Sequence, residues 1–120
     1  MKGEAQLQSE CVKWFRLAYP DDIIFAIPNG GSRNVVEAYN LKRQGVLAGV
    51  PDLFVARQNS NDLMGYGYVI GGLFVEMKYG KGKLTTQQDV MGKKLLEKGY
   101  AVAICRTFDE FKNTIDEYFN

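Results

Sequence analysis

The stretch that decides the fold is LFVEMK, residues 73–78. Side chains alternate between the two faces of a β-strand, so Glu76 and Lys78 share one face, roughly 7 Å apart along the chain, while Val75 and Met77 share the other. The apolar residues before them predict a mostly buried strand. A carboxylate and an ammonium group are costly in such a place unless they are paired or bound to a metal ion, so we expect this strand to carry a functional site.

A second apolar run, DLFVA at residues 52–56, also contains a charged residue, because Asp52 stands at its beginning. The run has the length and composition of a strand buried on both faces. Three ionisable groups, Asp52, Glu76 and Lys78, therefore lie at the ends of apolar strands that we expect to be neighbours. Charged groups collected in this way indicate a site rather than an ordinary surface.

The remaining hydrophobic periodicity predicts an alternation of helices and strands. The helical segments are residues 4–19, 35–44, 85–98 and a closing segment from Thr107 or Asp109 to about residue 119, and the strands are residues 23–27, 52–56, 69–78 and 100–105. Thr85 and Gln88 have the spacing of a capping box, and Asn34 suits an N-cap. The polar residues 57–68 predict a loop or a loose hairpin arm. The order predicts one α/β domain, residues 1–120, with a central mixed sheet flanked by helices.

Composition narrows the class of protein. No run approaches the roughly 18 apolar residues of a membrane helix, and no targeting pattern is present, so we expect a soluble cytoplasmic protein without a membrane partner. Cys11 and Cys105 lie in apolar runs and form no CxxC pair, which predicts buried reduced thiols rather than a disulfide or a zinc site. The chain has no histidine, which excludes Ser-His-Asp and Cys-His catalysis and histidine-ligated zinc.

The net charge of +1 gives no bulk attraction to nucleic acid, so any attraction to phosphate has to come from a local cluster. Lys78, Lys81 and Lys83 form the candidate cluster. Lys93 and Lys94 follow, and they are equally well explained as solvated lysines.

The candidate site predicts chemistry without histidine. Two carboxylates offer the hard oxygen ligands that Mg²⁺ and Mn²⁺ prefer, and such ions also take phosphate oxygens. A lysine beside them could orient or deprotonate a water molecule and offset charge on the phosphate. This combination favours a phosphodiester hydrolase. The glycine- and lysine-rich residues 80–83 lack the spacing of a P-loop, so no nucleotide cofactor is expected.

The spacing of these residues matches a known signature. Pro51-Asp52, a gap of 23 residues and then Glu76-Met77-Lys78 resembles the PD-(D/E)xK nuclease motif. Four further segments carry a resemblance to the VRR-NUC family: Glu4-x-x-x-Gln8, Pro28-Asn29-Gly30-Gly31, Gly49 to Leu53, and Lys83-Leu84-Thr85-x-x-Gln88. The likeness spans almost the whole chain and is closest to the minimal stand-alone members found in phages and bacteria. It implies a restriction-endonuclease-like core and a bacterial or phage-infected host cell as the location.

The resemblance also implies roles for individual residues. Asp52 and Glu76 correspond to the metal-binding acids, the Met77 carbonyl to a backbone ligand of the metal, and Lys78 to the catalytic lysine. Gln88 matches a glutamine that follows the lysine in this family, although its capping role explains it equally well.

The opening helix contributes a further acid in such proteins, and two residues compete for this role. Glu4 lies at the centre of the apolar stripe of the helix, whereas Glu10 falls about 100° or more from the axis of that stripe. We therefore choose Glu4, which is also explained as a favourable acid in a first helical turn.

One loop is a candidate for contact with DNA. Asn29, Gly30, Gly31 and Arg33 could present backbone amides and a guanidinium to phosphate, and an ordinary turn explains them equally well.

The function implied is a Mg²⁺- or Mn²⁺-dependent DNA endonuclease. The family resemblance suggests branched DNA, such as four-way (Holliday) junctions or flaps, and a homodimer. Two alternatives remain: a catalytically silent DNA-binding or assembly module that keeps the fold, and a restriction-like enzyme that cuts duplex DNA. The lack of a separate recognition domain weighs against the second alternative.

Overall fold

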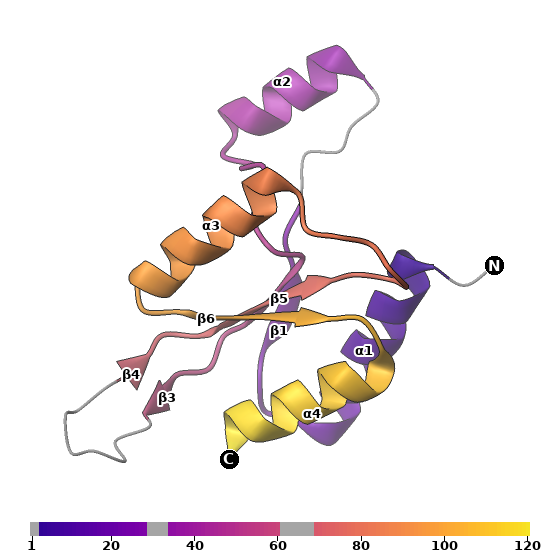
Figure 1. Cartoon of the computed structure of the whole chain (residues 1–120), viewed down its shortest axis with the longest axis vertical. Coiled ribbons are helices and arrows are strands. Elements are labelled where there is room, and N and C mark those ends of the chain that lie inside the picture. Colours follow the sequence, from indigo (N-terminus) through magenta and orange to yellow (C-terminus); the bar gives the residue numbers. More distant parts are fainter. Residues whose placement is uncertain (1–2, 29–33, 61–68) are drawn as a thin grey trace.

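The computed structural model describes residues 3–28, 34–60 and 69–120. The elements in chain order are α1 (Glu4–Ala18), β1 (Ile24–Ala26), α2 (Val35–Arg43), β2 (Leu53–Val55), β3 (Asn59–Ser60), β4 (Val69–Ile70), β5 (Leu73–Met77), α3 (Thr86–Glu97), β6 (Ala101–Cys105) and α4 (Phe108–Phe119). Four strands form the main sheet in the order β1-β2-β5-β6 (Figure 1). The pairs β1/β2 and β2/β5 are antiparallel, while β5/β6 is parallel. The prediction of an α/β domain with a central mixed sheet flanked by helices is confirmed.

Strand β5 lies in the middle of this sheet and positions the charged residues. Val75 is opposite Leu53 of β2 and opposite Ala103 of β6. Parallel strands need a long crossover connection, and α3 makes the connection between β5 and β6. Glu76 is therefore enclosed by a strand on each side and is next in space to the helix that follows it in the chain.

The two faces of the sheet differ in their covering. Helices α1 and α4 pack together under one face, and α3 lies over the other (Figure 1). The core is on the side of α1 and α4, where the buried side chains are Leu7, Cys11, Phe15, Leu53, Val55, Val75, Met77, Cys105, Phe111 and Ile115. Odd-numbered residues of β5 point into this core, and the even-numbered Glu76 points toward the side of α3.

The two cysteines are buried and free, as predicted. Burial raises the pKa of the Cys11 thiol to about 12, because the charged thiolate is poorly solvated there and Cys105 and Glu10 oppose its charge further. A protonated, enclosed thiol of this kind is chemically inert.

Some boundaries differ from the sequence prediction. The strand predicted over residues 69–78 is divided at Gly71 and Gly72 into β4 and β5, and β4 pairs with β3 in a separate two-stranded ribbon. Of the segment predicted as a loop or hairpin arm, Asn59 and Ser60 are paired with Ile70 and Val69, and residues 61–68 lie outside the described part. Thr107 is the N-cap of the closing helix, which settles the choice between Thr107 and Asp109.

The prediction that residues 52–56 are buried on both faces is wrong for one face. Leu53 and Val55 are fully buried under α1 and α4, whereas Phe54 is half-buried on the opposite face. The reason is that α3 is a single helix and is too narrow to cover that face as far as β2. Phe54 instead contacts the rings of Phe25, Phe74 and Tyr100.

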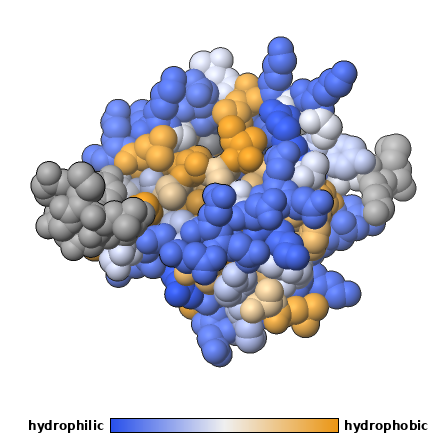
Figure 2. Space-filling view, turned by 60° about the horizontal axis from the view of Figure 1, so that its bottom comes forward, coloured by the Kyte–Doolittle hydropathy of each residue, from blue (hydrophilic) through white to orange (hydrophobic). Residues whose placement is uncertain are grey.

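Helix α2 stands apart from the rest of the molecule. It begins as predicted at the Asn34 cap, whose side chain accepts hydrogen bonds from the backbone N–H groups of Val36 and Glu37. None of its residues is buried, and it extends away from the sheet (Figure 1). The face of the molecule seen in Figure 2 is mostly hydrophilic with separate apolar patches. No described helix has the length and apolarity needed to span a bilayer.

Candidate active site

Asp52 ties the beginning of β2 to the end of β5. Its Oδ2 atom accepts a 2.8 Å hydrogen bond from the backbone N–H of Met77. Its backbone carbonyl accepts a 2.8 Å bond from the N–H of Ile27, just after β1. Three strands therefore hold this aspartate, and its carboxylate is directed toward the residues on either side of Met77.

Glu76 is the one charged or polar side chain that is buried among the described residues, with 3% of its surface exposed. Gln88 Nε2 donates a 3.3 Å hydrogen bond to Glu76 Oε1. The Gln88 Oε1 atom accepts a 2.9 Å bond from the N–H of Thr85, and Thr85 Oγ1 accepts a 3.1 Å bond from the N–H of Gln88. Gln88 therefore completes the predicted capping box and at the same time fixes the carboxyl group of Glu76.

Three charged side chains influence the pKa of Glu76. The pKa of Glu76 is raised to about 8, chiefly by burial and then by a hydrogen bond with Asp52 and its negative charge. The charge of Glu4 raises this pKa further, and the positive charge of Lys78 lowers it. Asp52, Lys78 and Glu4 are thus each close enough to Glu76 to influence its charge.

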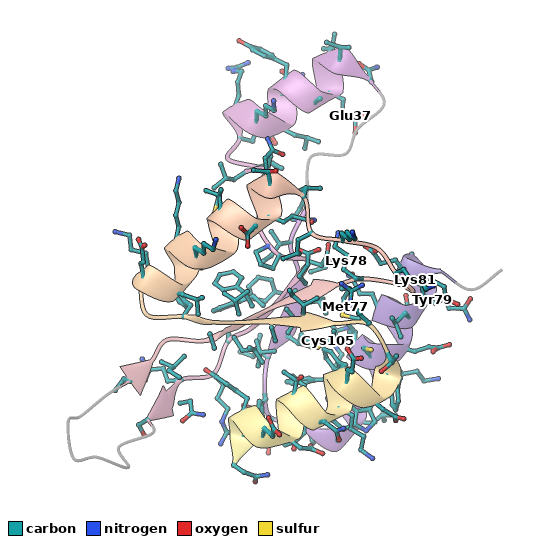
Figure 3. The ribbon with its side chains drawn as sticks, viewed as in Figure 1. Glu37, Met77, Lys78, Tyr79, Lys81 and Cys105 are labelled. Carbon is teal, nitrogen blue, oxygen red and sulfur yellow. The ribbon has the colours of Figure 1, made fainter. Side chains whose placement is uncertain are left out.

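Lys78 begins the connection between β5 and α3. Its backbone N–H donates a 3.0 Å hydrogen bond to the carbonyl of Cys105, which extends the parallel pairing by one residue. Lys78, Tyr79 and Lys81 follow one another where the chain leaves β5, near the beginning of α1 (Figure 3). The side chains of Lys81 and Lys83 are exposed. Of the predicted lysine cluster, Lys78 is therefore the member that acts on Glu76, while Lys81 and Lys83 are exposed on the connection that follows it.

The structure separates the two candidate acids of the opening helix. Glu4 lines a cavity of about 500 Å³ together with Asp52. Glu10 lines a different cavity, beside Tyr79 and Arg106. Glu4 is therefore the residue placed next to the strand acids, on the side that the helical wheel indicated.

Other candidates are not brought to this centre. Asn29, Gly30, Gly31 and Arg33 lie outside the described residues. Lys93 pairs with Asp89 at 3.1 Å on the exposed side of α3, which agrees with a solvated lysine.

Sequence reasoning missed Arg106, and it named Gly49 only as part of the Gly49 to Leu53 segment, without a structural role. The Arg106 guanidinium donates hydrogen bonds to the carbonyls of Gly80, at 3.2 Å, and Gly82, and so holds the lysine-bearing connection. Gly49 has a φ of +88° and passes so close to α3 that a Cβ atom there would be 2.7 Å from the backbone oxygen of Gln87. A glycine three residues before Asp52 is itself a signal of special backbone geometry, but nothing local indicates the contact of Arg106.

The donor set fits a hard divalent cation. Within residues 3–28, 34–60 and 69–120 no three acidic, thiol or imidazole groups form a complete ligand cage. Mg²⁺ commonly uses only one or two carboxylates and keeps several waters. Asp52 and Glu76 supply such a pair, and burial together with the neighbouring Asp52 raises the pKa of Glu76, so a cation bound there would favour its charged form. The pair therefore suits Mg²⁺ or Mn²⁺, which prefer carboxylate oxygens to the softer ligands that other metals select.

Comparison with known proteins places the chain in a family. A search of curated proteins found no match. A solved structure described as a VRR_NUC domain protein superposes with a TM-score of 0.74 at 24% sequence identity, covering 98% of this chain and 90% of that one, which establishes the shared fold. The model of the VRR-NUC domain matches residues 2–109. The chain therefore belongs to the VRR-NUC domain family, whose nuclease-type domains process DNA and generally use divalent metal ions.

Proposed function

We propose that this protein is a Mg²⁺- or Mn²⁺-dependent endodeoxyribonuclease that hydrolyses phosphodiester bonds by attack of water. The observation that carries the proposal is the convergence of Asp52, Glu76 and Lys78 at the end of β5, where Asp52 accepts a 2.8 Å hydrogen bond from the N–H between the other two residues. A pair of acids, one of them buried, beside a lysine is the arrangement that suits phosphate chemistry in a chain without histidine.

The residues have distinct roles in this proposal. Asp52 and Glu76 would hold the ion, with the Met77 carbonyl as a backbone ligand and Glu4 assisting from α1. A bound divalent ion supplies Lewis-acid polarisation of the phosphate. Lys78 orients the attacking water and offsets the negative charge that develops on the phosphate.

Gln88 is a positioning residue in the proposal. Its 3.3 Å hydrogen bond holds the Glu76 carboxyl in one orientation, and the capping box fixes Gln88 itself. The lysines of the connection after β5, Lys81 and Lys83, are exposed and lie where they can contact DNA phosphates.

We further propose that the substrate is branched DNA, namely four-way junctions or flaps, and that the active form is a homodimer. Helix α2 supports the dimer, because it leaves large apolar side chains exposed, Val36 with 67% and Tyr39 with 62% of their surface. Exposed apolar groups on one helix are typical of a protein interface. A two-fold pair would set two active sites on one branched substrate.

The test is a cleavage assay with labelled linear duplex, flap and four-way junction DNA, with and without Mg²⁺ or Mn²⁺. Lys78→Ala and Asp52→Ala should each lower the rate at least about 100-fold, the usual contribution of a catalytic acid, base or ion-binding group. Lys112→Ala, an exposed lysine on α4, is the control and should cut at the parental rate.

Each alternative has its own outcome in this assay. DNA binding without metal-stimulated cutting would favour the silent module, and cutting of linear duplex at one sequence would favour a restriction-like enzyme. Equal rates for Lys78→Ala, Asp52→Ala and the parent would show that the active site is elsewhere.

A further inference from the structure

Two cavities beside α1 adjoin each other, because Gln8 and Ser9 line both. The first, about 500 Å³, contains Glu4 and Asp52 of the candidate active site, and Gln8 and Ser9 complete its wall on the helix. The second, about 560 Å³, begins at the same Gln8 and Ser9 and continues along the helix to Lys13 and Arg16. The residues shared by both make one groove between α1 and β1, which we call the α1 groove.

Helix geometry gives the α1 groove its length. Glu4, Gln8, Val12 and Arg16 are spaced by four residues and form one row along α1, next to the buried row that packs on the sheet. At a rise of 1.5 Å per residue, Lys13 is about 14 Å and Arg16 about 18 Å along the axis from Glu4. The groove therefore leads away from the acidic centre over several nucleotide lengths.

The charge changes sign along the α1 groove. Its inner end carries Glu4 and Asp52, and its outer end carries Lys13 and Arg16. The Arg16 guanidinium donates a 3.2 Å hydrogen bond to the carbonyl of Ile24 on β1, which fixes it at the rim. A guanidinium has five N–H donors, so this bond leaves others for a phosphate.

We propose that the α1 groove binds the backbone of the DNA strand that leaves the active centre, with Lys13 and Arg16 contacting phosphates about two or three nucleotides from the cleaved bond. The inference rests on the proposed nuclease function, because the strand has to enter at Asp52. The acidic end suits a metal-bridged phosphate, and the basic end suits bare phosphates. Since phosphates carry no sequence information, binding through these contacts should be independent of sequence.

Binding measurements test the proposal separately from cleavage. Lys13→Gln and Arg16→Gln, alone and together, would be compared with Lys98→Gln and Lys112→Gln, which remove the same charges from exposed positions away from the α1 groove. Fluorescence anisotropy with labelled duplex and four-way junction, without divalent metal and over a salt series, gives Kd and its salt dependence.

The double variant should raise Kd about tenfold at low salt and lower the slope of log K against log salt by about two, one for each phosphate that is no longer neutralised. Arg16→Lys should retain most of the affinity, since it keeps the charge. Because Arg16→Gln also removes the bond to Ile24, Lys13→Gln provides an independent readout, and equal melting temperatures show that both variants are folded.

A second experiment tests where along the DNA strand Lys13 and Arg16 make their phosphate contacts. Neutral methylphosphonate linkages placed one at a time on each side of the cleaved bond should weaken parental binding at about the second or third nucleotide on one side. The same linkages should have no further effect in the double variant.

The outcomes separate the two proposals. If the parent binds DNA and the groove variants behave like the Lys98 and Lys112 controls, the groove assignment is overturned while the nuclease can stand. If the parent binds without cutting and the groove variants still weaken binding, the groove is supported and the nuclease is not. A parent that binds no DNA at low salt overturns both.

Discussion

Glu76 is a carboxyl group in a place where its charge is poorly solvated, and this makes stability depend on pH. Its folded pKa of about 8 lies above the ordinary 4.5, so the folded protein holds a proton that the unfolded chain releases. This contribution to stability is fully present below pH 4.5 and is lost as the pH rises toward and through 8. The slope is at most about 1.4 kcal/mol per pH unit.

Glu76→Gln should therefore remove most of this pH dependence. In the absence of divalent metal the variant should melt at a higher temperature than the parent at pH 8.5 and at a similar temperature at pH 5, because the glutamine stays neutral. Thermal melts in a chelating buffer measure this, with Glu117→Gln, an exposed acid on α4, as the control. A variant that is destabilised equally at both pH values would make Glu76 a structural partner instead.

Gly49 is a second residue whose effect can be isolated. An added Cβ would meet the Gln87 backbone at 2.7 Å, so Gly49→Ala has to push the segment before Asp52 away from α3, which carries Gln88. Gly45 is a matched control, with a φ of +108° but open space around it. Both alanines incur the cost of a positive φ, about 1 kcal/mol.

Gly49→Ala should lower kcat at least about tenfold beyond any effect of Gly45→Ala, since displacements of about 1 Å at a site are costly. The measurement is steady-state cleavage with melting curves for both variants. Equal kcat values would show that the close approach does not set the distance between Asp52 and Gln88.

At the level of elements, the connection between β5 and α3 is held by Arg106, the residue that follows β6. Arg106 bonds to two carbonyls of this connection, so it restricts the lysines carried there. Arg106→Ala should raise KM for DNA about threefold to tenfold, from the loss of bonds worth about 0.5–1.5 kcal/mol each, and leave kcat within about twofold.

Arg106→Lys should recover only part of this loss, because an ammonium lacks the fork of a guanidinium. Steady-state measurement of kcat and KM for both Arg106 variants tests this prediction, with Lys112→Ala as the control. A fall in kcat with unchanged KM would show that Arg106 acts on Lys78 rather than on DNA binding.

The same elements show which features could be predicted from the sequence and which could not. The capping box of α3 was predictable because it depends on Thr85 and Gln88, three residues apart. The motif acids were predictable because a charge in an apolar strand is anomalous by itself. The Arg106 contact joins residues more than 20 apart, and the covering of Phe54 depends on where α3 lies over the sheet. Such features depend on tertiary packing, which local patterns do not encode.

At the level of the whole molecule, α2 has no buried residue and extends away from the sheet. If it forms the dimer interface, Val36→Glu should convert the protein from twice the 13.5 kDa of one chain to a monomer. Light scattering after size exclusion measures this, and Ile23→Glu, an exposed apolar residue before β1, is the control. A parent that is monomeric at micromolar concentration, or a Val36→Glu variant that stays dimeric, removes α2 from this role.

The central place of β5 in the sheet determines when during folding the site around Glu76 forms. Glu76 gains its environment only when β2 has paired on one side and β6 on the other, and β6 is made after α3. Long-range pairing of this kind comes late in folding. In the proposed nuclease, a ribosome-bound or partly unfolded chain therefore carries every acid and the lysine without an assembled site, so DNA cleavage would begin only after folding is complete.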